Sequence, residues 1–215
     1  MLFFVILFLF GTTVAQTPKP CTSPHQWEAR VHSSNLNFDA DLLGRFSYDS
    51  VFQRTRILQH VKVGRTETYY DIISLYQDKL AFMIDMKTAK CSRFNFDQPW
   101  RDFGIQSDAT PLGVAYIGSS ALSDATLLVT IWTGKEIIPI NETARYIDTW
   151  TQNSCLPVSN IVFEPSGSVN HLRYYDVTLG INDPNVFIPP ESCFTHERHL
   201  VQYFPFGTLR KNMLF

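Results

Sequence analysis

The sequence predicts a mostly β protein, an antiparallel sandwich or a partly open barrel with little helix. Short runs rich in β-branched and aromatic residues recur along the chain, and turn signals separate them at short intervals. Helix signals are weak, since a segment such as 97–104 contains both Pro99 and Gly104. Hydrophobic residues make up 45% of the 215 residues and charged residues 18%, which is the composition of a globular chain.

The expected strands follow from alternation and from their flanking turns. In 43–48, Phe46 and Tyr48 share one face and Ser47 points to the other, because alternate residues of a strand share a face. Residues 77–79 are expected to form the turn of a hairpin. In chain order, the expected strands cover residues 43–48, 53–58, 69–76, 80–84, 127–132, 145–150, 158–164 and 172–179.

The N-terminus has the pattern of a cleavable signal peptide. Residues 1–10 are uniformly apolar, and the small residues Thr13 and Ala15 stand at the −3 and −1 positions of a cleavage site. The apolar run is far shorter than the ~20 residues that span a bilayer. No Lys or Arg precedes it, so an uncleaved anchor is the alternative. We expect residues 1–15 to be the signal peptide, 16–195 a single β domain and 196–215 a C-terminal tail.

Export changes how the four cysteines are interpreted. Cys21, Cys91, Cys155 and Cys193 are an even number in an exported chain, which predicts two disulfides, and three pairings are compatible with their spacing. No C-x-x-C pair occurs, which disfavours a zinc or redox site. The sequon at Asn141 predicts N-glycosylation.

Catalytic motifs are absent from the sequence. There is no G-x-S-x-G elbow, no Walker loop and no G-x-G-x-x-G. His196 and His199 are three residues apart, whereas the zinc-protease motif H-E-x-x-H needs four. The formal net charge of −2 gives no electrostatic reason to expect nucleic acid. We therefore expect a non-enzymatic protein that requires no cofactor and binds no nucleic acid.

Short motifs spread over about residues 21–194 resemble one family. Each motif is weak alone, but their order and spacing are specific. They are Cys21 with Gln26-Trp27-Glu28, Phe46-Ser-Tyr-Asp49, Ile84-Asp85 before Lys90-Cys91, Gln98-Pro-Trp100, Tyr116-Ile-Gly118, Val129-Thr-Ile-Trp132, Cys155-Leu-Pro-Val158, Asp176-Val-Thr-Leu-Gly-Ile181, Asp183-Pro184 and Val186-Phe-Ile-Pro-Pro190 to Cys193. On these residues the chain resembles the ependymin-related proteins.

The resemblance implies a fold and a set of properties. The fold would resemble the bacterial lipoprotein-carrier half-barrel, with two stacked antiparallel sheets around an apolar pocket. Cys21 would pair with Cys155 and Cys91 with Cys193. The protein would be a secreted or lysosomal glycoprotein and a homodimer, with lipid binding, calcium binding and contacts to the extracellular matrix. Asn182 and Asp183 are then the expected calcium ligands, and a capped turn before Pro184 is the alternative role of Asp183.

Apolar rows on the expected strands are the candidates for lining the pocket, with ordinary core packing as the alternative for each row. The candidate residues are Phe46, Tyr48, Tyr70, Ile72, Tyr76, Phe82, Ile84, Leu127, Val129, Ile131, Leu172 and Tyr174. The expected function is binding of lipid or another apolar ligand between the sheets. The alternatives are an extracellular calcium-binding adhesion or signalling protein and a hydrolase with an unrecognised site.

Overall fold

Eleven strands form one continuous antiparallel sheet in the computed structural model, which describes residues 17–35, 37–95, 99–137 and 142–194. The strands are β1 (Gln26–Asn35), β2 (Ala40–Asp49), β3 (Arg54–Val63), β4 (Thr66–Leu75), β5 (Leu80–Asp85), β6 (Cys91–Asn95), β7 (Thr110–Gly118), β8 (Thr126–Ile137), β9 (Thr143–Thr151), β10 (Pro157–Phe163) and β11 (Val169–Leu179). Their order in the sheet is β6-β5-β4-β3-β2-β1-β11-β10-β9-β8-β7. The 3₁₀ helices are η1 (Ser123–Ala125), η2 (Pro184–Phe187) and η3 (Glu191–Cys193).

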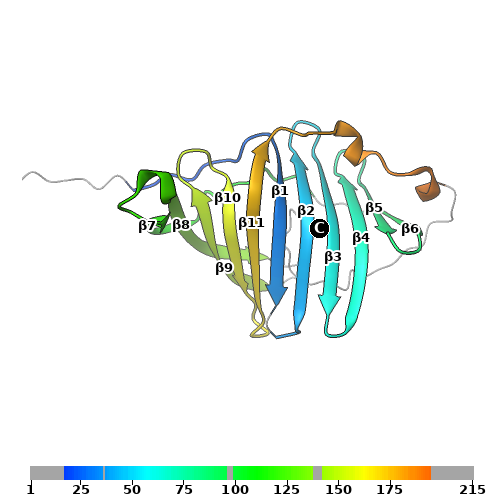
Figure 1. Cartoon of the computed structure of the whole chain (residues 1–215), viewed down its shortest axis with the longest axis horizontal. Helices are drawn as coiled ribbons and strands as arrows, with labels where there is room; N and C mark the ends of the chain where they lie inside the picture. Colours follow the sequence, from blue (N-terminus) through cyan, green and yellow to red (C-terminus); the bar gives the residue numbers. More distant parts are fainter. Residues whose placement is uncertain (1–16, 36, 96–98, 138–141, 195–215) are drawn as a thin grey trace, which may run out of the picture.

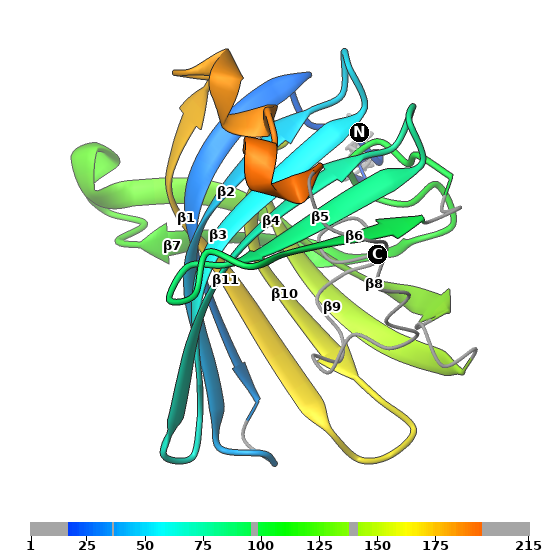
Figure 2. The same ribbon diagram turned by 90° about the vertical axis from the view of Figure 1, so that its right-hand side faces the viewer.

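The mostly β, antiparallel prediction is confirmed, with one difference in how the strands are joined. The resemblance implies two stacked sheets, whereas β1 pairs with both β2 and β11 and so joins the two halves into one unclosed sheet. Figures 1 and 2 show the halves diverging from this central pair and curving around a concave side. Strand twist accumulates over many strands, so two halves of a single sheet can face each other much as two layers would.

The main apolar core lies on the concave side. Alternation places one set of side chains from each strand there, and cross-strand partners point to the same face. The cluster draws on both halves of the sheet, and its large members are Trp27, Phe46, Tyr48, Ile57, Ile72, Trp132, Trp150, Leu172 and Tyr174.

The connection between β6 and β7 adds Phe103 to this core. The Phe103 ring is fully buried and lies 5.2–6.3 Å, centroid to centroid, from five other aromatic rings. Its backbone N–H donates to the Tyr48 hydroxyl (2.9 Å), and its carbonyl accepts from the Ser23 N–H (2.8 Å). We call residues 99–106 the Phe103 segment. It docks on the N-terminal segment, which the Cys21–Cys155 disulfide fastens to the domain.

A second apolar cluster lies on the convex side. It consists of Ile73, Phe82, Ile84 and Cys193. Residues 180–194, which we call the C-terminal strap, cross the sheet at its upper edge in Figure 1 and reach β6, where Cys193 bonds to Cys91. Both disulfides therefore have the pairing that the resemblance implies. The predicted signal peptide, Asn141 and the tail 196–215 lie outside the described residues.

Candidate functional site

The concave face is organised in layers that run across the strands. The first layer holds Trp27 and Tyr48, and the second holds Phe46, Ile57 and Ile72. The Phe103 ring contacts Trp27, Tyr48 and Phe46. The Phe103 segment therefore closes this end of the interior as a packed core.

Two further layers continue toward the β1–β2 and β3–β4 hairpins. The third layer consists of Tyr174, Val31, Gly44, Gln59 and Tyr70, which are partners in register across five strands. The fourth contains Leu172, Leu42 and Val61 on the same face. These layers are largely apolar, and the buried amide of Gln59 lies among them.

The other half of the sheet also turns polar side chains to the concave face. The carboxylate of Asp148, which is fully buried, accepts a 2.6 Å hydrogen bond from Asn160 Nδ2. Trp132 Nε1 donates to Thr130 Oγ1 (2.9 Å). The concave interior is thus largely apolar, with a few buried polar groups among the apolar side chains.

The structure brings together only part of the predicted pocket set. The residues on the concave face are Phe46, Tyr48, Tyr70, Ile72, Tyr76, Leu172 and Tyr174. Burial raises the pKa of Tyr76 to about 12, in agreement with its position against the Trp100 ring.

Two of the five predicted rows are corrected because they point the other way. Phe82 pairs with Ile73 and lies under the C-terminal strap on the convex side, together with Ile84. Leu127, Val129 and Ile131 alternate with the concave residues Thr130 and Trp132, so they too point away from the interior. Strand alternation predicts which residues share a face, but it does not predict which face is concave.

The convex side carries a separate pocket of about 250 Å³ beside the strap. Its charged lining is Glu28, Arg30, Arg45, Arg56 and Asp176. Most of these charges are paired: Arg30 with Asp176 at 2.5 Å and Arg56 with Asp71 at 2.7 Å. Glu28 Oε2 accepts the Asn182 N–H (3.1 Å), which anchors the start of the strap.

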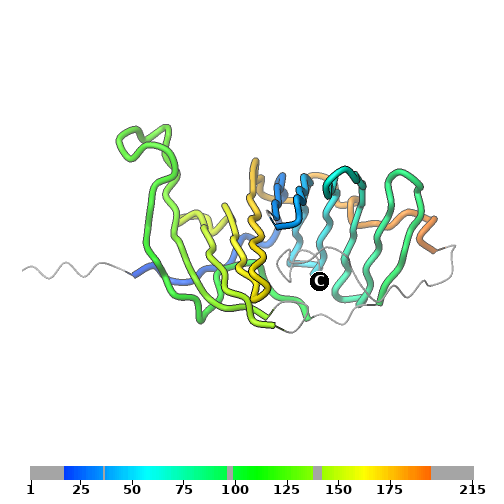
Figure 3. The backbone as a smooth tube through the Cα atoms, turned by 90° about the horizontal axis from the view of Figure 1, so that it is seen from below, coloured from blue at the N-terminus to red at the C-terminus, as the bar shows by residue number. Residues whose placement is uncertain are grey.

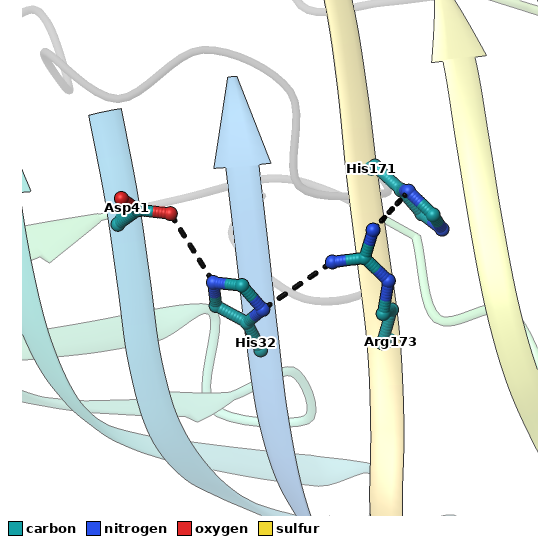
Figure 4. Close-up of polar contacts among 4 residues, drawn as sticks. All are labelled: His32, Asp41, His171 and Arg173. Carbon is teal, nitrogen blue, oxygen red and sulfur yellow. Dashed lines mark hydrogen bonds and ion pairs between the residues drawn. The ribbon is translucent and has the colours of Figure 1, made fainter. Parts of the chain in front are cut away.

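A chain of polar contacts links three strands farther along the convex side (Figure 4). His32 Nε2 lies 3.2 Å from Asp41 Oδ1, and Arg173 reaches Nδ1 of both His32 (3.4 Å) and His171 (2.7 Å). Partial burial, followed by the positive charges of Arg173 and His32, lowers the pKa of His171. A neutral His171 imidazole suits this arrangement, because the arginine N–H needs a lone pair on Nδ1 to donate to.

The predicted calcium ligands form a capped turn. Asp183 Oδ1 accepts the Asn185 N–H (2.9 Å) at the start of η2, which is the alternative role considered for it. Among the residues that the structure describes, no group of three or more His, Cys, Asp or Glu side chains could hold a metal ion. Calcium takes six to eight oxygens, so a site at Asn182 and Asp183 would need further oxygen ligands.

Within the same described ranges, no helix is long and apolar enough to cross a membrane.

Comparisons with known proteins show similarity in both sequence and fold. The family profile described as Ependymin matches residues 64–193. The chain is 31% identical to mammalian ependymin-related protein 1 of Rattus norvegicus, over 83% of this chain and 78% of that protein. It is 26% identical to ependymin-1 of Oncorhynchus mykiss, over 87% and 84%. An uncharacterized conserved protein of Thermus thermophilus shares the fold, with a TM-score of 0.50 at 14% identity over 80% of this chain and 86% of that one. The chain therefore belongs to the ependymin family.

Proposed function

We propose that this protein is an exported carrier that binds a lipid or another apolar molecule on the concave side of its sheet. The observation that carries the proposal is the inner face itself, since both halves of the curved sheet turn apolar side chains toward it. Membership of the ependymin family supports the same interpretation. The proposal includes N-glycosylation at Asn141, and it does not include calcium at Asn182 and Asp183.

The driving force would be burial of apolar surface. Each methylene group of a ligand that leaves water contributes about 0.8 kcal/mol. The Phe103 segment fills the interior at the first two layers. The ligand is therefore expected beyond it, against the third and fourth layers, where Val31, Leu42 and Val61 point inward.

The test is saturable binding of a fluorescent phospholipid or fatty-alcohol probe to delipidated protein. Val61→Phe enlarges a buried concave side chain, and Leu43→Phe makes a comparable change at a convex residue that is 57% exposed. We expect V61F to lower probe affinity and L43F to leave it unchanged, with both variants retaining the wild-type circular dichroism spectrum. A folded wild-type protein without saturable binding would rule out the carrier function.

A separate observation supports a contact with a second copy of the chain. The β7–β8 hairpin projects from the end of the sheet (Figure 3) and carries the exposed apolar residues Leu112, Val114, Tyr116, Ile117, Leu122 and Leu127. Large exposed apolar patches commonly mark protein contacts, and β7 is an edge strand. The homodimer proposed here predicts that Val114→Glu shifts the sedimenting species to monomer. A wild-type protein that is monomeric at high concentration contradicts it.

A further inference from the structure

Gln59 is an unusual residue for the middle of a sheet. It lies on β3 between Ile57 and Val61, both members of the concave core, and so its side chain points to the same interior. The residue is 2% exposed. Neither Oε1 nor Nε2 of its amide has a hydrogen-bond partner. A buried amide without partners loses its hydrogen bonds to water and gains none in return, so such a group needs an explanation.

The surroundings of Gln59 leave its amide facing the interior. Its register partner on β2 is Gly44, which has no side chain, and its partner on β4 is Tyr70. A Cβ placed on Gly44 would lie 3.4 Å from Gln59 Cβ and 2.8 Å from the Leu58 carbonyl oxygen. The close approach of β2 and β3 therefore requires glycine. Gln59 has the apolar side chains of Ile57 and Val61 beside it on β3 and Tyr70 opposite on β4.

The chemistry of an amide limits what could bind to it. A glutamine amide offers two N–H donors and a carbonyl acceptor and carries no charge. A neutral group with both a donor and an acceptor, such as a hydroxyl, matches it. An ionised carboxylate would lose its hydration at this depth and gain only a neutral partner, so its binding is disfavoured.

Resting on the proposed carrier function, we infer that the Gln59 amide is the polar contact for the ligand, and that the protein selects neutral, hydroxyl-bearing lipids over pure hydrocarbons and over ionised fatty acids. The apolar part of such a molecule would lie against the third and fourth layers, and its hydroxyl group would satisfy the amide. Gln59 is then a specificity-determining residue of the same site.

The experiment compares 1-dodecanol, n-dodecane and dodecanoate, the last at about pH 8, as competitors of the fluorescent probe. Gln59→Met removes both polar atoms at similar volume, and Gln59→Leu is a second variant of the same kind. Gln77→Met makes the identical change in the exposed β4–β5 turn. Both Gln59 variants should fold, because removing an unpaired buried amide relieves a desolvation cost.

For wild type and Q77M, we expect dodecanol to bind more tightly than dodecanoate. The alcohol-to-alkane affinity ratio should fall about 5- to 10-fold in Q59M and Q59L, the value of one hydrogen bond. An unchanged ratio in both variants, particularly with a raised Tm, would overturn the inference and indicate that a buried water serves the amide. If wild-type protein binds the probe but shows no preference for the alcohol over dodecanoate, the inference fails while the carrier function stands. If wild-type protein binds nothing, both fail.

Discussion

Phe103→Ala is the most direct test of how the interior is built. The ring is fully buried and packs against the rings of Trp27, Phe46, Tyr48, Trp150 and Tyr174. Core Phe→Ala changes cost about 3–5 kcal/mol, and the many aromatic contacts place this one toward the upper end of that range. Since total stabilities are about 5–15 kcal/mol, we expect a large fraction of the folding free energy to be lost.

Urea unfolding followed by tryptophan fluorescence measures this loss directly, and the Tm should fall by about 10–15 °C at about 2–4 °C per kcal/mol. Phe38→Ala is the matched control, because Phe38 is 65% exposed. The cavity left by F103A should also bind a small apolar molecule that raises the Tm of the variant and not of wild type. A loss below about 1 kcal/mol in F103A would refute the description of Phe103 as part of the packed core.

Two further predictions concern the convex side. The variant C91S/C193S lacks the second disulfide, which joins residues that are 102 positions apart. Its free energy of unfolding should fall by about 2–5 kcal/mol, and binding of a hydrophobic dye to the convex cluster of Ile73, Phe82 and Ile84 should increase. An unchanged free energy of unfolding in urea would contradict this. The pKa of His171 is lower in the folded protein than the value of about 6.5 expected in the unfolded chain. The folded state therefore favours neutral His171, and the resulting stability is present above about pH 6.5 and is lost as the pH falls through the folded pKa. Histidine NMR titrations should therefore show a pKa of His171 below the ordinary value of about 6.5. Arg173→Gln should raise the pKa of His171, and no change would mean that Arg173 has no electrostatic effect there.

Much of the strand content can be predicted because it depends on local pattern. The alternation in 43–48 corresponds to the end of β2, and residues 77–79 do form the turn between β4 and β5. The local pattern does not predict the strands β1, β6 and β7. β1 contains the run His32-Ser-Ser-Asn35 and β7 contains Gly113 and Pro111, residues that weaken a strand signal and that pairing with neighbours overrides.

The role of Phe103 cannot be found from spacing. Pro99 and Gly104 predict only a turn over residues 97–104, and both residues do exclude a helix. The available signal is the pair Trp100 and Phe103, since two large aromatic side chains in a loop are costly to expose. Gly104 has a packing reason as well: a Cβ there would lie 2.7 Å from the Cys21 carbonyl oxygen.

The two disulfides fasten elements to opposite faces of the same sheet. Cys21–Cys155 holds the N-terminal segment on which Phe103 docks, so it stabilises the end of the concave interior that the Phe103 segment closes. Cys91–Cys193 holds the strap over Phe82 and Ile84 on the convex side. The two halves of the curved sheet share the concave core, whereas the convex side has no facing half and is partly covered by the strap. Each disulfide therefore holds in place a chain segment that completes the burial of one face.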